Sequence, residues 1–279
     1  MKFLESLFQF FDARMQTPPL YGWFHLLWLA ITATVAVFLV VRFRDCSDRI
    51  FRRIMLIAWL FFLIPEVYKQ LIYSISLSDG QWVWDFQWYA FPFQLCSTPL
   101  YVYPLVAFLK DGKLRDMAIS FSALFAFFGG LAVMLYPGDV FISIIGINIQ
   151  TMINHGGQVV FGIFCAARYR KQLSTRFWLK SLPVFGGLFL IATVLNIAAY
   201  HLLPLVGIDE TFNMFFISPY YDTTLPVLSM FNGLPHIFLS LIYLAAFTLI
   251  SFIMYWLHRG VYLLCLRLCS KHKEPQHEA

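Results

Sequence analysis

Seven apolar runs, each long enough to cross a lipid bilayer, constrain this chain more than any other feature. A helix rises about 1.5 Å per residue, so roughly 20 apolar residues span the hydrocarbon core. Because hydrocarbon offers the backbone no hydrogen-bond partners, each run is expected to be helical. The runs are residues 21–41, 54–75, 88–109, 117–136, 148–167, 178–201 and 236–257. The sequence therefore predicts an all-α, polytopic membrane protein, a bundle of seven transmembrane helices.

The composition agrees with a membrane location and excludes a soluble globule. Hydrophobic residues make up 60% of the chain and charged residues only 13%, about half the share found in soluble domains. We expect a multi-pass protein of the cell membrane. The formal net charge of +5 comes mostly from the connections on one side of the membrane, so it gives no reason to expect nucleic acid as a partner.

The basic residues predict the orientation of the bundle. Lys and Arg crowd the first, third and fifth connections and follow the last span, whereas the second, fourth and sixth connections contain none. Under the positive-inside rule, the odd connections and the C-terminus are cytoplasmic. The N-terminus is then outside.

We expect one transmembrane domain, residues 1–270, followed by a polar cytoplasmic tail, residues 271–279. Apolar and polar residues alternate at helical spacing over about residues 1–16, which predicts an outer interfacial helix rather than a signal peptide. The five cysteines do not describe a disulfide framework. Cys265 and Cys269 are interpreted as juxtamembrane packing in preference to acylation or a metal site with His272.

Polar side chains gather at one depth in the predicted outer half of the membrane. At 1.5 Å per residue, Cys96 lies roughly 12 Å, His155 roughly 10 Å and Glu66 roughly 13 Å below the outer boundary. Lys69 is one turn above Glu66 on the same face, and Asn196 lies near the outer end of the sixth span. Ionisable groups at such depth are costly, so they normally face the bundle interior and mark a site.

A thiol and an imidazole at one level suggest nucleophilic chemistry. The imidazole of His155 would draw off the proton of Cys96, and the thiolate would attack a carbonyl group. Asn154 precedes the histidine, and Gly156-Gly157 follow it and let a neighbour approach. The alternatives are a cysteine that only fills space and a histidine that only links helices.

Prolines and a long connection predict a covered cavity. Pro92 interrupts the third span and could turn the amide of Gln94 towards the thiol as an oxyanion donor. The sixth connection, about residues 202–235, is long and aromatic and contains Asn213-Met-Phe-Phe. We expect it to fold back over the polar level as a lid or re-entrant segment.

The sequence also resembles a known family. Pro92-Phe-Gln94-Leu-Cys96, Asn154-His155-Gly156, Glu66 and Asn213-Met-Phe-Phe are similar to the pattern of the YwaF-like integral membrane proteins, which include the eukaryotic transmembrane protein 164 group. The resemblance extends from the first span to the last. The eukaryotic group is regarded as a lipid acyltransferase, so the resemblance implies Cys96 as the acyl acceptor and His155 as the base.

The leading hypothesis is an enzyme that transfers or hydrolyses a lipid acyl group, with Cys96 and His155 as catalytic residues. The candidate orienting or substrate-binding residues are Glu66, Lys69, Gln94, Asn154, Asn196 and Asn213. Membrane lipids are the expected substrate, and no cofactor, metal or obligatory protein partner is expected. The alternative is a transporter or channel in which Glu66, Lys69 and His155 form the polar site.

Overall fold

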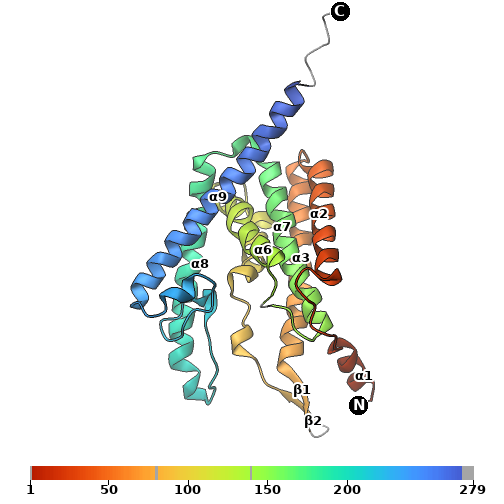
Figure 1. The fold of residues 1–279 in the computed structure, drawn as a ribbon, viewed down its shortest axis with the longest axis vertical. Helices are drawn as coiled ribbons and strands as arrows, with labels where there is room; N and C mark the ends of the chain where they lie inside the picture. The colour runs from red at the N-terminus through yellow and green to blue at the C-terminus, as the bar shows by residue number, and fades with distance from the viewer. Residues whose placement is uncertain (1, 79–80, 139, 272–279) are drawn as a thin grey trace, which may run out of the picture.

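The computed structural model describes residues 2–78, 81–138 and 140–271. These residues are mostly helical, as predicted. Figure 1 shows the long helices running along one direction, with the hairpin β1–β2 and helix α1 at one end and the last turns of α9 beyond the other. We call these the hairpin end and the C-terminal end. The helices are α1 (Lys2–Phe11), α2 (Trp23–Phe43), α3 (Asp48–Ser74), α4 (Pro99–Phe108), α5 (Lys113–Phe121), α6 (Phe127–Leu135), α7 (Ile145–Arg168), α8 (Thr175–Leu202) and α9 (His236–Lys271).

Among the residues that the structure describes, four helical rods are long and apolar enough to cross a membrane. They are Trp23–Phe43, Lys113–Leu135, Thr175–Val206 and His236–Ser270. The second of these joins α5 to α6 through a π-helical turn, η3 (Ser122–Ala126). The third adds the 3₁₀ turn η5 (Pro204–Val206) to the end of α8. The protein is therefore a helical membrane protein.

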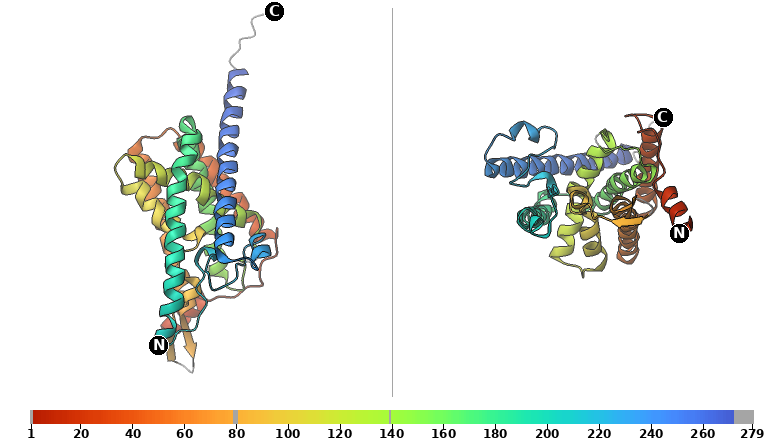
Figure 2. Two further views of the ribbon diagram at one scale, coloured as in Figure 1. Left: turned by 90° about the vertical axis from the view of Figure 1, so that its left-hand side faces the viewer. Right: turned by 90° about the horizontal axis from the view of Figure 1, so that it is seen from below.

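Helices α3 and α7 have comparable lengths but carry more polar residues. Helix α7 packs against α2, α3 and α6, and most of its side chains are buried. Its polar residues thus face other helices. Figure 2 shows the long helices side by side, with α9 leaning across the others.

The third predicted span is not one helix. It consists of two 3₁₀ turns, η1 (Trp88–Ala90) and η2 (Leu95–Ser97), and then α4. Pro92 lacks an amide hydrogen and disfavours helix in the residue before it, and Pro99 starts a new helix at its first position. Cys96 therefore lies in a short turn between irregular backbone and α4, rather than on the regular helix that the apolar run predicted.

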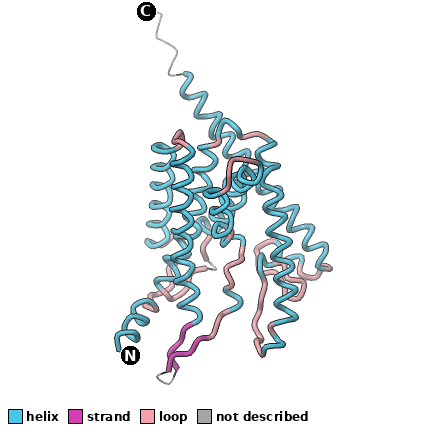
Figure 3. Tube along the Cα trace, turned by 180° about the vertical axis from the view of Figure 1, so that it is seen from behind, coloured by secondary structure: helices cyan, strands magenta, loops and turns pink. Residues whose placement is uncertain are grey.

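A two-stranded hairpin is the departure from the all-α prediction. Strands β1 (Ile75–Ser78) and β2 (Gln81–Trp84) pair antiparallel directly after α3. The second strand reads Gln-Trp-Val-Trp, and aromatic and β-branched residues favour extended backbone. Figure 3 shows the hairpin in magenta, projecting at the end opposite the C-terminus. Helix α1, expected over about residues 1–16, ends at Phe11. The predicted tail, residues 271–279, lies outside the described residues apart from Lys271.

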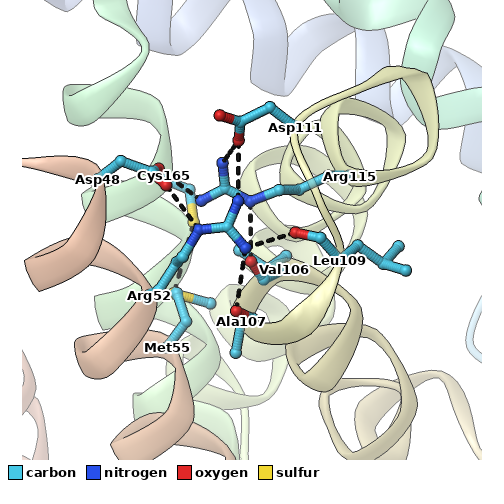
Figure 4. Close-up of polar contacts among 9 residues, drawn as sticks. All are labelled: Asp48, Arg52, Met55, Val106, Ala107, Leu109, Asp111, Arg115 and Cys165. Atoms are coloured by element: carbon cyan, nitrogen blue, oxygen red, sulfur yellow. Dashed lines mark hydrogen bonds and ion pairs between the residues drawn. The ribbon is translucent and has the colours of Figure 1, made fainter.

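An Arg–Asp network ties α3, α4 and α5 together near the C-terminal end. Arg115 is 3% exposed, and its guanidinium donates to the Val106 carbonyl at 2.9 Å and to the Asp48 carboxylate at 2.6 Å. Carbonyls at a helix end lack partners within the helix, and the arginines supply them here. Figure 4 shows the contacts that join Asp48, Arg52, Asp111 and Arg115 to one another and to the carbonyls of Val106, Ala107 and Leu109.

Candidate functional site

Cys96 is held against α7 through its backbone. Its carbonyl oxygen accepts hydrogen bonds from the side-chain amides of Asn154 at 3.3 Å and Gln158 at 2.9 Å. These two residues are one helical turn apart and so lie on one face of α7. The contact brings η2 to the level of His155, which directly follows Asn154. The predicted common depth of Cys96 and His155 therefore agrees with the packing.

His155 is oriented by its own helix. It is 6% exposed, and its Nδ1 lies 2.8 Å from the carbonyl oxygen of Thr151. Because a carbonyl only accepts, Nδ1 is assigned the proton and Nε2 keeps its lone pair. Within the described residues, Nε2 takes part in no hydrogen bond. The tautomer is the one that a general base needs.

The thiol and the imidazole are not hydrogen-bonded to each other in the part of the chain that the structure describes. Their pairing remains a prediction.

Glu66 and Lys69 form a buried ion pair. The Lys69 ammonium lies 2.8 Å from Oε1 of Glu66, and the two side chains are 16% and 7% exposed. Gln70 adds a second donor to Oε1 at 2.7 Å and also donates to the Ala90 carbonyl at 2.8 Å. The carboxylate is thus neutralised, and Gln70 links it to η1, a few residues before Cys96.

Gln94 and Asn196 hold the sixth connection rather than the thiol. Gln94 donates to the Asn213 carbonyl at 2.9 Å and accepts from the Phe215 amide at 2.7 Å. Asn196 donates to the Met214 carbonyl at 3.0 Å and accepts from the Met214 amide at 2.7 Å. Both ends of each side-chain amide are engaged. The Gln94 amide, predicted as an oxyanion donor, is therefore committed to the loop backbone in this structure.

Asn213 shapes the same loop from within. Its Oδ1 accepts from the Ser218 amide at 2.9 Å, and its Nδ2 donates to the Asp222 carbonyl at 3.3 Å. Met214 and Phe215 are at most 1% exposed. The loop thus folds back into the core, as expected, and the segment that carries Cys96 lies between this loop and α7.

Sequence reasoning missed two amides of this region, Gln70 and Gln158. Each lies four residues after a predicted site residue, Glu66 or Asn154, and therefore on the same helix face. That spacing was the available signal. Gln158 is fully buried, and its Oε1 has no hydrogen-bond partner within the described residues.

Metal binding has no support in the described residues. They contain no group of three or more His, Cys, Asp or Glu side chains that could hold a metal ion. Cys265 and Cys269 are both exposed free thiols near the end of α9, and His272 lies beyond the described part of the chain.

The sequence model of the TMEM164 family matches residues 20–268. The match begins just before α2, ends near the end of α9 and includes every candidate site residue. No curated protein and no solved structure matches the chain.

Proposed function

The chain belongs to the TMEM164 family, and on that premise we propose that it transfers or hydrolyses the acyl groups of membrane lipids, with Cys96 as nucleophile and His155 as general base. One observation carries the proposal. Asn154, which directly precedes His155, and Gln158, three residues after it, hold the Cys96 carbonyl against α7. A nucleophile and a base held by one rigid helix can keep the geometry that proton transfer needs.

The proposed reaction has two halves. In the first, Nε2 of His155 takes the thiol proton, and the thiolate of Cys96 attacks the ester carbonyl of a lipid. The ester C–O bond breaks, an acyl thioester forms on Cys96, and the imidazolium returns its proton to the departing alkoxide. In the second, a lipid hydroxyl or water gives its proton to Nε2 and attacks the thioester. The acyl group leaves, and the proton returns to the thiol.

The charged pair has a supporting role in this scheme. We assign Lys69 the role of a buried cation that favours the negative form of the thiol. Glu66 compensates that ammonium when the thiol is neutral. A compensated cation costs less to bury than a free one. We assign Glu66, Lys69 and Asn154 orienting and electrostatic roles.

We also propose that the chain crosses the membrane seven times, with the N-terminus outside and the C-terminus in the cytoplasm. Each of the seven apolar runs coincides with a helix or, for the third, with η1, η2 and α4. Helix α1 and the C-terminal end of α9 lie at opposite ends of the bundle (Figure 1), which agrees with an odd number of crossings. The site would then take lipid from the outer leaflet of the cell membrane. We further propose that the chain is related to the YwaF-like integral membrane proteins.

A transporter is the second candidate function, and the buried Glu66–Lys69 pair favours it. Intramembrane ion pairs often line substrate or proton pathways. In that case flux through proteoliposomes would survive Cys96→Ala and would be lost in Glu66→Gln. The acyl-transfer proposal expects the opposite dependence on the thiol.

The proposal is tested with the purified chain in nanodiscs that contain phospholipid with a labelled acyl chain. Cys96→Ala is expected to remove the labelled thioester and all acyl transfer or release. His155→Ala is expected to slow both by about 10²–10⁴-fold, the usual contribution of a general base. Cys46→Ala is the control, because Cys46 lies in the connection between α2 and α3. A Cys96→Ala protein with undiminished acyl turnover would sink the mechanism.

A further inference from the structure

The loop formed by residues 212–235 connects α8 to α9 and lies at the depth of α8 itself. Figures 1, 2 and 3 show it level with the hairpin-side half of α8 and short of the end of that helix. The hydrogen bonds agree, because Asn196 binds the backbone of Met214 six residues before α8 ends at Leu202. Six helical residues correspond to about 9 Å. Helix α8 is long and apolar enough to cross a membrane, and Asn196, where the loop is attached, lies within the apolar run 178–201 that is expected to cross it.

Side-chain amides satisfy the irregular backbone of this loop. Asn232 donates to the Thr223 carbonyl at 3.0 Å and accepts from the Thr223 amide at 3.1 Å. Gln94 and Asn196 pair with residues 213–215 in the same two-ended way. Non-helical backbone survives at membrane depth only where protein groups replace water as its partners. The loop meets this requirement at residues 213–215 and again between Thr223 and Asn232.

The two faces of the loop differ. Its inner face is buried, and the residues there are Phe212, Met214, Phe215, Ile217 and Leu228. Its outer face exposes Val227 by 68% and Met230 by 81%. Residues 223–240 include no Asp, Glu, Lys or Arg. No charged side chain in this stretch therefore favours an aqueous outer face, although Thr224 and Ser229 are exposed.

Val227 adopts a conformation that a β-branched residue rarely has, with φ of 69°. Glycine or asparagine would adopt a positive φ at lower cost. The exposed valine side chain therefore stands at a position where its backbone conformation costs free energy. Contact with an apolar partner would offset that cost.

The exposed face of the loop continues directly into the lipid-facing side of α9. The 3₁₀ turn η7 (Leu228–Phe231) packs on α9. Just beyond it, Leu234, Ile237 and Phe238 are 43%, 62% and 53% exposed. Because α9 is itself a candidate membrane-crossing helix, lipid covers its exposed apolar side chains. One apolar surface thus runs from Val227 to α9.

We propose that the 212–235 loop is a membrane-embedded re-entrant segment whose outer face, Val227 and Met230, packs among the acyl chains of bilayer phospholipids. The bonds of Gln94 to Asn213 and Phe215 then join the embedded loop to the segment that carries Cys96. The proposal stands without the acyl-transfer function, because it depends only on where the loop lies.

The test uses the full chain in phosphatidylcholine nanodiscs with a photo-crosslinking amino acid at position 230. The same amino acid at Leu241, which is 54% exposed on α9, provides the lipid-facing reference. Position Asp209, exposed beyond the end of α8, provides the aqueous reference. Phospholipid adducts are read by mass spectrometry. Position 230 is expected to match position 241 and to exceed position 209 by about tenfold, since hydrocarbon surrounds the first two alone.

Two results would overturn the proposal. One is a lipid-adduct yield at position 230 no higher than at position 209, which would place the loop tip in water. The other is a crosslink that joins two copies of the chain through position 230. That result would show that the outer face of the loop packs against a second copy of the chain and not against lipid. A second probe at Val227 repeats the comparison from the neighbouring turn, so that one poorly tolerated substitution does not decide the outcome.

Discussion

The side-chain nitrogen of Gln158 donates a 2.9 Å hydrogen bond to the carbonyl oxygen of Cys96, and this contact joins the candidate nucleophile to the helix of the candidate base. Gln158 is fully buried, so water cannot replace it. Asn154, one turn earlier, makes the longer of the two bonds. The pair sets where η2 sits relative to His155.

Gln158→Met is therefore expected to slow acyl transfer more than it weakens lipid binding. Methionine keeps the length of the side chain but loses the donor, which costs about 1–3 kcal/mol at a buried carbonyl. We expect kcat to fall by about tenfold with KM nearly unchanged, because misplacement affects the reacting geometry. Steady-state kinetics in nanodiscs measure both quantities. Unchanged kcat, with the melting temperature lowered, would assign Gln158 a structural role only.

Lys69→Met is expected to destabilise the protein, and a second substitution should rescue it. The single change leaves the carboxylate of Glu66 buried without its cation, at a cost of about 3–5 kcal/mol. Glu66→Gln combined with Lys69→Met removes both charges and should recover most of that loss. Unfolding in detergent micelles, followed for both single variants and the double variant, gives the coupling energy.

The double variant also separates stability from chemistry. It should fold like the native chain but react slowly with thioester-forming lipid probes, because the double change removes the cation to which we assign support of the thiolate. A double variant with native thiol reactivity would contradict the role proposed for Lys69.

Much of this arrangement could be predicted from the sequence, and the rest depended on packing. Apolar run lengths predict the helices because the bilayer fixes how many residues must cross. Depth counting brought Cys96 and His155 to one level for the same reason. The rotation of each helix does not follow from run length, so the role of Gln158 and the two-ended bonds of Gln94 and Asn196 were not foreseen. The 3₁₀ turn at Cys96 was missed because Pro92 and Pro99 were treated as kinks in one helix.

Asn196→Leu is expected to release the loop from α8. Leucine has a similar size but leaves the amide of Met214 without a partner and its carbonyl with the Ile217 amide alone, and a buried orphan costs about 1–3 kcal/mol. Hydrogen exchange in the peptide that spans residues 212–218 should accelerate strongly. Thr193→Val is the matched control, because the Thr193 hydroxyl bonds only within its own helix, to the Phe189 carbonyl at 3.0 Å. Equal exchange rates in the two variants would contradict the role of Asn196 in holding the loop to α8.

Arg115→Met should destabilise the junction of α3, α4 and α5. The change removes the donors to Val106, Asp48 and Asp111 and leaves the two carboxylates with Arg52 alone. Because Arg115 is buried but its carboxylate partners are partly exposed, we expect a loss of about 1.5–3 kcal/mol, the range for hydrogen bonds to charged groups. Arg53→Met, at an exposed neighbouring position, should change stability by less than about 0.5 kcal/mol. Thermal unfolding in micelles compares the two, and equal shifts would show that the network of Figure 4 contributes little.

Two adjacent glycines of α6 provide a matched test of how closely α6 must approach α7. A Cβ atom on Gly130 would overlap the His155 carbonyl oxygen and would lie 2.6 Å from Cβ of Gln158. One on Gly129 would meet nothing closer than 3.4 Å, at Oε1 of Gln158. Gly130→Ala must therefore push α7 away, which costs about 1–3 kcal/mol and displaces His155 and Gln158 together. Gly129→Ala should be neutral or slightly stabilising, because alanine favours helix over glycine by about 1 kcal/mol.

The measurement is acyl turnover and melting temperature for both alanine variants. Gly130→Ala should lower both the acyl turnover and the melting temperature, whereas Gly129→Ala should leave both close to their native values. If the two variants behaved alike, the close contact of α6 with the backbone of His155 would have no part in holding the base. The argument that α7 positions it for Cys96 would then lose its steric support.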